Sequence, residues 1–282
     1  MKKILSLISI FTIFLVSCEK TVNNVNVPNN TPKLVCQAFI SPNESILKLY
    51  LTWSKPLFGN SSTFGFTPEK NAKVVISNNN KQTQLVYYED VNKQIFYYWT
   101  NTSSLDIKPN DELKLEVTAA NGDVISSQTI VPEMAKFTLK IELIDSVADN
   151  WAFTGYSYSY TLGITSNNTY GDSYYCIAAL GYVSINGLDS NVIFEKNNYG
   201  NAYYKFAPGE TKIITLTNYI PVDSIKLYVL NTDAPYYFYH KSVNNFSGDN
   251  PFAEPVIIYS NIKNGLGVFS SYNKTQKVIK LK

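Results

Sequence analysis

The chain has 282 residues and a formal net charge of +2, and every one of its basic residues is a lysine. Arginine binds phosphate groups through paired hydrogen bonds, and phosphate contacts dominate nucleic-acid affinity. A nearly neutral chain without arginine is therefore a poor nucleic-acid binder. The 22 tyrosines favour β-strands, and frequent Asn and Gly residues mark many turns, so the composition indicates an all-β protein.

The N-terminus has the pattern of a secretory signal peptide, with two lysines after the first Met and a short apolar run over residues 4–16. This run is shorter than the roughly 20 apolar residues that a membrane-spanning helix needs. Residues 15–18, Leu-Val-Ser-Cys, end the segment and resemble the lipobox of bacterial lipoproteins. We therefore expect residues 1–17 to be removed and Cys18 to carry a lipid that anchors the protein to a membrane.

Residues 18–33 form an Asn- and Pro-rich segment with little apolar surface to bury, which predicts a flexible tether. From residue 34 the pattern changes to short strands separated by turn residues, with an Asn-Gly hairpin signal at 121–122. These strands predict an immunoglobulin-like β-sandwich over residues 34–132. They are Leu34–Ile40, Ile46–Trp53, Lys73–Ser77, Thr83–Tyr88, Gln94–Trp99, Glu112–Ala119 and Asp123–Val131.

The second half, residues 133–282, predicts another antiparallel β-domain that carries one short helix near 234–246. Asp233 can cap this helix, and Pro235 suits a first helical position. The expected strands are Phe137–Ile144, Ala152–Ile164, Ser173–Ser184, Asn191–Lys196, Tyr203–Phe206, Lys212–Thr217, Ser224–Leu230, Val256–Tyr259, Leu266–Tyr272 and Lys277–Leu281.

Two cysteines remain besides Cys18. Cys36 and Cys176 each lie in an apolar strand, and the two strands are assigned to different domains. An envelope compartment permits disulfides, but free Cys packs as a small apolar side chain, so we expect two buried free thiols. No pair of cysteines has the spacing of a metal site.

Two segments resemble a known family. The first is Pro-Lys-Leu-Val-Cys-Gln-Ala-Phe-Ile at 32–40, and the second is Tyr-Tyr-Phe-Tyr-His-Lys-Ser at 236–242, followed by Asn-Pro-Phe at 250–252 and Gly-Leu-Gly-Val-Phe at 265–269. Together they are similar to Bacteroidota lipoproteins of the domain-of-unknown-function 4249 family, over nearly the whole mature chain. The resemblance implies a two-domain β lipoprotein of the outer membrane that accompanies a TonB-dependent transporter. The family brings no catalytic residues.

The C-terminal block of this resemblance also has a physical interpretation. The glycines on both sides of Leu266 indicate a tight turn or a close approach of another backbone, and the two X-Pro pairs favour extended or turn conformations. The block is either a shaped loop that docks onto a partner or a loop that only closes the sandwich. The candidate docking residues are Tyr236, Tyr239, Phe246, Asn250, Pro251, Phe252, Asn261, Gly265 and Gly267.

The sequence contains no constellation that predicts an enzyme. His240 is the only histidine, and no nucleophile elbow, zinc-protease helix, P-loop or dinucleotide fingerprint occurs. The acidic pairs lie in turn-like segments, where carboxylates are solvated, so they predict no glycosidase site. Asp189, Asp233 and Asp249 lie in loops without the spacing of a calcium-binding hand. We expect no catalytic activity, cofactor or metal ion.

Aromatic residues give a second candidate for ligand binding. Tyr156, Tyr158 and Tyr160 alternate, which places all three on one face of a strand. Such a face could bind a sugar, peptide or protein, although cross-strand aromatic packing is the simpler explanation and the one we favour. The segment between Pro56 and Pro68 is long and holds Phe58, Phe64 and Phe66, which either bind a ligand or cover the core.

Two functions are therefore compatible with the sequence. The first is an accessory or binding subunit of a TonB-dependent transporter, anchored in the outer membrane through Cys18, facing the cell surface and assisting nutrient capture. The second is a free-standing surface lipoprotein that binds a ligand or adheres to another surface. In both cases the ligand is unknown.

Overall fold

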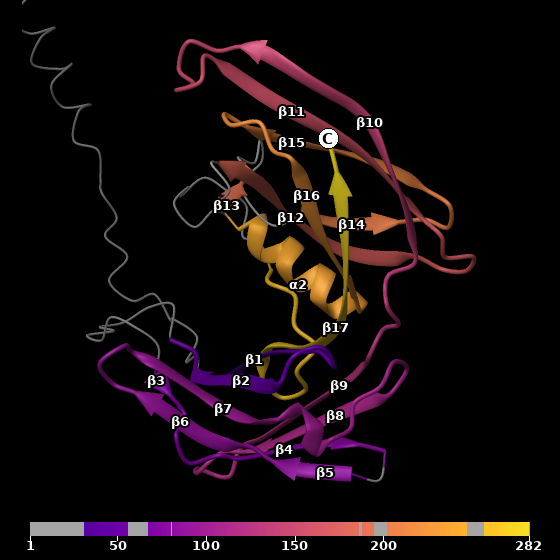
Figure 1. Ribbon diagram of the computed structural model, residues 1–282. Helices are drawn as coiled ribbons and strands as arrows, with labels where there is room; N and C mark the ends of the chain where they lie inside the picture. The colour runs from indigo at the N-terminus through magenta and orange to yellow at the C-terminus, as the bar shows by residue number, and fades with distance from the viewer. Residues whose placement is uncertain are drawn as a thin grey trace, which may run out of the picture. The chain divides into compact units, whose positions relative to one another are not determined.

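The computed structural model (Figure 1) describes residues 31–55, 67–79, 81–185, 188–194, 202–246 and 257–281. The expected signal peptide, Cys18 and most of the expected tether lie outside these residues. In the described part, strands dominate and one α-helix is present, so the all-β prediction with a single short helix is confirmed. None of the described helices is long and apolar enough to cross a membrane.

The first half folds into the strands that its alternating pattern predicts, with two differences, one of which is the additional short strand Thr67–Pro68. The expected strand Thr83–Tyr88 is two strands, β5 and β6, which belong to different sheets and are separated by the buried Leu85. The elements are β1 (Leu34–Ile40), β2 (Ile46–Trp53), β3 (Thr67–Pro68), β4 (Lys73–Asn78), β5 (Lys81–Gln84), β6 (Val86–Asp90), β7 (Ile95–Asn101), a 3-10 turn (Thr102–Ser104), β8 (Glu112–Thr118) and β9 (Val124–Ile130).

These strands form a two-layer sandwich. The sheet β5-β4-β8-β9 is one layer, and the neighbouring strands β1, β2, β7 and β6 belong to the other. Every second residue of β1, β4 and β8 is buried, as expected for strands with one face toward a core. The shared core contains Leu49, Leu51, Tyr98, Ile76 and Leu115. Each such aliphatic side chain stabilises the fold by about 1.5–3 kcal/mol when fully buried.

The second half contains longer strands and the helix. The structure differs from the prediction at the C-terminus, where the two expected strands form one long strand, β17, and the described residues 257–259 form no strand. The elements are β10 (Phe137–Ala148), β11 (Tyr156–Ser166), β12 (Ser173–Ile185), β13 (Leu188–Ile193), β14 (Ala202–Phe206), β15 (Thr211–Asn218), β16 (Ser224–Thr232), α2 (Ala234–Asn244) and β17 (Leu266–Lys280).

A second core lies between the sheet β10-β11-β15 and strands β12, β14 and β16. Leu162 and Ile164 of β11 meet Tyr175 of β12 and Leu227 and Val229 of β16 in this core. Helix α2 contacts β12, β14 and β17. Its N-terminus is fixed by Asp233, whose side chain accepts a hydrogen bond from the backbone nitrogen of Tyr236 at 2.9 Å.

Strand β17 joins the two halves into one sheet, with the order β13-β12-β16-β17-β1-β2-β7-β6. It pairs antiparallel with β16 through residues 272–280 and parallel with β1 through residues 266–271. The two ranges that the sequence predicts as separate domains, 34–132 and 133–282, therefore contribute strands to the same sheet. This parallel pairing of β1 could not be read from local pattern, because its two strands lie at opposite ends of the chain.

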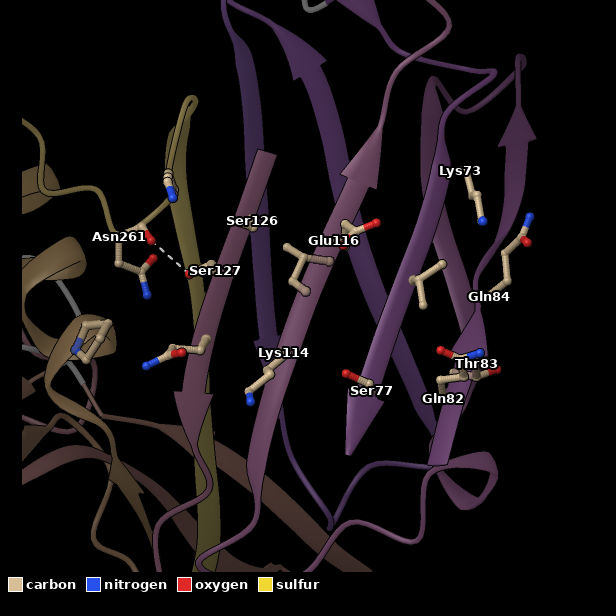
Figure 2. A pocket seen from close by; sticks show the side chains of 15 residues that line it. Lys73, Ser77, Gln82, Thr83, Gln84, Lys114, Glu116, Ser126, Ser127 and Asn261 are labelled. Atoms are coloured by element: carbon tan, nitrogen blue, oxygen red, sulfur yellow. Dashed lines mark hydrogen bonds between the residues drawn. The ribbon is translucent and has the colours of Figure 1, made fainter. Parts of the chain in front are cut away.

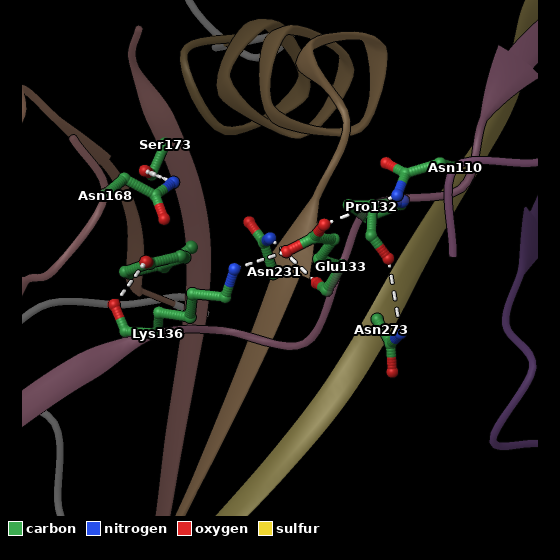
Figure 3. Close-up of polar contacts among 9 residues, drawn as sticks. Asn110, Pro132, Glu133, Lys136, Asn168, Ser173, Asn231 and Asn273 are labelled. Carbon is green, nitrogen blue, oxygen red and sulfur yellow. Dashed lines mark hydrogen bonds and ion pairs between the residues drawn. The ribbon is translucent and has the colours of Figure 1, made fainter. Parts of the chain in front are cut away.

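The connection between the two ranges is held by hydrogen bonds (Figure 3). Asn273 of β17 donates to the carbonyl oxygen of Pro132 at 3.2 Å, and Asn231 of β16 donates to that of Glu133 at 2.9 Å. The Glu133 carboxylate accepts from Asn110 at 3.3 Å and forms an ion pair of 2.5 Å with Lys136. The segment around residue 132 is therefore bonded to strands of the shared sheet.

Candidate functional site

A polar groove of about 940 Å³ crosses the outer face of the sheet β5-β4-β8-β9. Alternation places it there, because Val74 and Ile76 of β4 face the core while Lys73 and Ser77 face outward. Figure 2 shows the lining side chains projecting from neighbouring strands. The groove is lined by Lys73, Val75, Ser77, Gln82, Thr83, Gln84, Lys114, Leu115, Glu116, Ser126, Ser127, Gln128, Pro235, Asn261 and Lys263.

The chemistry of this groove suits a polar ligand. Lys73 and Lys263 form no ion pair with any described residue, whereas Lys114 lies 3.2 Å from Glu112. Glu116 is the one carboxylate among the described lining residues, and none of these residues is aromatic. The lysines, amides and hydroxyls can bind hydroxyl and anionic groups, but no aromatic ring is available to stack on a sugar.

The groove ends beside the N-terminus of α2, where a mostly buried carboxylate joins three elements. Asp233 accepts hydrogen bonds from the hydroxyl of Thr129 in β9 and, at 3.3 Å, from the backbone nitrogen of Ser271 in β17. The Thr129 and Ser271 hydroxyls lie 2.8 Å apart. Burial raises the pKa of Asp233 to about 6, although these donors favour its charged form. This arrangement explains why the helix begins here, and it involves no ligand.

The docking candidates in and just after helix α2 differ in their exposure to solvent. Tyr236 is only 8 % exposed and packs with Phe39 and His240, at ring-centroid distances of 5.0 and 4.3 Å. Tyr239 is half-buried, whereas Phe246 is exposed. Tyr236 is thus a core residue. Of the three docking candidates in this segment, Tyr239 and Phe246 are the ones that a partner could reach.

His240, the only histidine, is a packing residue as well. Its ring stacks on Tyr203 at 4.7 Å, and its Nδ1 lies 2.9 Å from the carbonyl oxygen of Tyr236. Burial lowers the pKa of His240, so the imidazole is neutral at pH 7. A ring stacked in this way contributes to the packing of the aromatic cluster.

The remaining described docking candidates bind the chain's own strands. The Asn261 side chain donates to the carbonyl oxygen of Phe269 at 2.7 Å and accepts from its nitrogen at 3.0 Å. Gly267 has a φ of +103°, and a Cβ there would lie 2.0 Å from the carbonyl oxygen of Cys36. A Cβ at Gly265 would lie 2.9 Å from the carbonyl oxygen of Leu34. The close approach predicted from the glycine pattern is therefore real, and its partner is β1.

The tyrosines of β11 form a gradient of exposure rather than an open binding face. Tyr156 is 48 % exposed, Tyr158 is half-buried, and Tyr160 is 3 % exposed. The Tyr160 hydroxyl accepts a hydrogen bond from the backbone nitrogen of Val222 at 2.9 Å, and its ring packs against Phe194. Packing, the simpler alternative from the sequence, accounts for Tyr158 and Tyr160.

Several predicted site residues lie outside the described residues. They are the lipidation site Cys18, the loop residues Phe58, Phe64 and Phe66, and the docking candidates Asn250, Pro251 and Phe252. Asp189 lies in β13 rather than in a loop, and its side chain and the whole of Asp249 lie outside the described residues, so Asp233 is the one of these three aspartates whose surroundings are described.

Among the described residues, neither the cysteines nor a group of metal-binding side chains forms part of the candidate site. Cys36 and Cys176 are buried thiols that form no disulfide with each other, as expected, and burial raises the pKa of the Cys36 thiol far above its usual range. Within the part of the chain that the structure describes, no group of three His, Cys, Asp or Glu side chains could hold a metal ion.

The sequence analysis missed one exposed apolar feature. Trp151 and Phe153 lie in the turn between β10 and β11, and both side chains are almost completely exposed. The prediction placed Ala152 and Phe153 inside a strand, whereas β11 begins at Tyr156. The signal that could have found them is a Trp-Ala-Phe sequence directly after Asp149-Asn150, where turn residues are normally polar.

Comparison with known proteins identifies the family but no function. A family model described as "Domain of unknown function (DUF4249)" matches residues 21–278. No curated protein matches the chain.

Proposed function

The chain belongs to the DUF4249 family, and on this basis we propose that it is a lipid-anchored binding subunit of the outer membrane, acting beside a TonB-dependent transporter in nutrient uptake. The Leu-Val-Ser-Cys sequence at 15–18 carries this proposal, because it assigns a lipid to Cys18. The expected tether at 18–33 would span at most about 58 Å at ~3.6 Å per residue. The folded part thus stays close to proteins of the same membrane.

A binding role rather than catalysis fits the described side chains. A glycosidase needs two carboxyl groups at its site. Among the described residues that line the groove, Glu116 is the only one with a carboxyl group. His240 stacks inside an aromatic cluster, and burial lowers its pKa. We propose that the protein has no catalytic activity of its own and positions cargo or contacts a transporter.

The proposal is tested by purifying the tagged, lipidated protein from its own membranes in mild detergent and identifying what accompanies it by mass spectrometry. A β-barrel TonB-dependent transporter in stoichiometric amount is the expected result. The matched control is Cys18→Ser, which cannot carry the lipid and should appear in the soluble fraction. Recovery of the lipoprotein alone, with other envelope complexes intact, contradicts the accessory role.

The polar groove favours a second candidate, a free-standing binder of an extended polar ligand. Three lysines and several amides line it, and it is open along the outer face of the sheet. Isothermal titration of the Cys18→Ser protein with acidic and neutral oligosaccharides would test this candidate. Binding that is lost in Lys73→Gln with Lys263→Gln, without any transporter partner, would favour it.

A further inference from the structure

The end of the β10–β11 hairpin presents a large apolar surface to solvent. Trp151 is 95 % exposed, and Phe153 in the same turn is fully exposed. One aromatic side chain can bury about 150–250 Å² in an interface. The two rings alone therefore provide a patch of the size that marks interaction sites on soluble proteins, about 300 Å² or more.

The apolar surface continues along both faces of the hairpin. Ala148 pairs with Tyr156 and Ile144 pairs with Tyr160, so Ile144 and Tyr156 share one face of the two strands. Leu143 and Val147 lie on the opposite face, and all four of these apolar side chains are exposed. Farther from the turn, Tyr160 on the face of Ile144 is buried against Phe194, so the exposed part of that face lies at the hairpin end.

Hydrogen bonds hold the turn in one conformation. The Asp149 carboxylate accepts from the backbone nitrogen of Trp151 at 2.9 Å, and the Asp149 nitrogen donates to the carbonyl oxygen of Gly155 at 2.9 Å. Thr154 donates to the carbonyl oxygen of Tyr219 at 2.5 Å, which ties the turn to the segment after β15. Both rings are thus presented on an ordered support, which reduces the entropy lost on binding.

The charge around the rings indicates the kind of partner. Residues 141–155 contain three acidic residues and no lysine. Lys140 pairs with Glu142 at 2.8 Å, whereas Asp145 and Asp149 form no ion pair with any described residue. Acidic groups beside the rings oppose contact with anionic lipid headgroups. They complement a protein surface whose apolar pocket has basic residues at its rim.

We infer that the hairpin end, residues 143–156, is a docking element that inserts Trp151 and Phe153 into an apolar pocket with a basic rim on the transporter. This inference rests on the proposed function, which supplies the partner, and it assigns the contact to residues of this chain. Trp is enriched among the few residues that contribute most of the binding energy of protein interfaces. Its contribution is large when its ring fills a pocket from which water is excluded.

Photocrosslinking in intact cells tests the contact directly. A photoreactive phenylalanine analogue replaces Trp151 in one variant and Tyr170 in a control, since Tyr170 is 91 % exposed in the loop after β11. We expect an adduct with the transporter at position 151 and none at position 170. A lipid adduct at 151, or a transporter adduct only at 170, overturns the inference.

A paired substitution separates this inference from the proposed function. Trp151→Ser with Phe153→Ser should reduce the transporter that co-purifies by at least about tenfold, as expected when two interface anchors are lost. Tyr170→Ser should leave it unchanged, and thermal unfolding should be the same in all three proteins. Equal recovery with the double variant overturns the docking element while the proposed function stands. Failure of the wild-type protein to co-purify a transporter overturns the proposed function and the partner together.

Discussion

Asp233 combines two opposed requirements in one side chain. As the residue before α2 it stabilises the first helical turn, but burial between β9 and β17 disfavours its charge. Because its pKa is about 6 in the folded protein and 3.8 for an unperturbed group, the folded state binds this proton more tightly than the unfolded state. The protonated carboxyl therefore stabilises the fold below pH 4, and this contribution is lost as the pH rises to about 6.

We predict that Asp233→Asn flattens this part of the pH dependence. Asn also caps helices well and carries no charge, so the free energy of unfolding should no longer fall between pH 4 and 6. The wild-type loss amounts to about 3 kcal/mol, at roughly 1.4 kcal/mol for each pKa unit. Urea unfolding at several pH values measures it, and an equal slope in both proteins would contradict the burial argument.

Tyr160 gives a second prediction, for a single hydroxyl group. Tyr160→Phe leaves the buried backbone nitrogen of Val222 without its acceptor, so the free energy of unfolding should fall by about 1–3 kcal/mol. Tyr156→Phe, on the exposed residue of the same face, should change it by less than about 0.5 kcal/mol. If chemical unfolding gives a similar loss of unfolding free energy for both substitutions, the buried hydrogen bond of Tyr160 does not stabilise the fold more than the exposed hydroxyl of Tyr156 does.

Between β1 and β17, two backbones run parallel at unusually close range. Gly267 has a left-handed φ, and any Cβ at this position would overlap the carbonyl of Cys36. Asn261 bonds to both backbone groups of Phe269 and so fixes the start of β17. A glycine is required here both by its conformation and by the space available.

We predict that Gly267→Ala lowers the free energy of unfolding by about 3 kcal/mol or more, since it adds steric overlap to the cost of a left-handed residue. Gly122→Ala is the matched control, because Gly122 has a φ of +92° with no atom within 4 Å of the added Cβ. Its cost should be about 1–2 kcal/mol, from conformation alone. If the two variants unfold at the same denaturant concentration, steric overlap with β1 adds nothing to the cost of the substitution at Gly267.

Most elements were predictable from local pattern, and the exceptions have physical reasons. The boundaries of β1 and β2 follow from alternation between turn residues. The division between β5 and β6 could not be predicted, because Leu85 keeps the alternation unbroken while the chain changes sheets. The prediction divided β17 at its polar residues 273–276, yet those residues continue to pair with β16.

The candidate sites were predictable only in part. The close approach at Gly267 follows from two glycines around one leucine, and the structure confirms it. The groove could not be predicted, because Pro235 and Asn261 join it from parts of the chain far from β4 and β8. Alternation identifies outward-facing residues of a strand but not which distant segment lies beside them.

At the scale of the whole molecule, β17 makes the two halves interdependent. It is the neighbour of β1 in the shared sheet, and its Phe269 lies in the core of the first sandwich. A chain of residues 34–132 alone lacks both the neighbouring strand β17 and the core side chain of Phe269, although the sequence predicts this range as a domain.

We therefore predict that a fragment of residues 34–132 does not fold stably on its own, whereas the mature protein unfolds in a single cooperative transition. Proton NMR dispersion of the fragment and calorimetry of the mature protein measure the two outcomes. Mixing the fragment with residues 133–282 should restore native signals. A well-dispersed spectrum from the fragment alone would show instead that the first sandwich is an independent domain.

The pairing of β1 with β17 also determines when folding can finish as the chain emerges from its N-terminus. Val35 pairs with Leu266, and contacts so distant in sequence slow folding. A chain that emerges from its N-terminus presents β1 long before β17 has followed, so one edge of an apolar strand has no neighbour in the meantime. Such an edge pairs readily with other chains. Under the proposed export, new molecules should therefore depend on a chaperone that binds them until β17 has emerged.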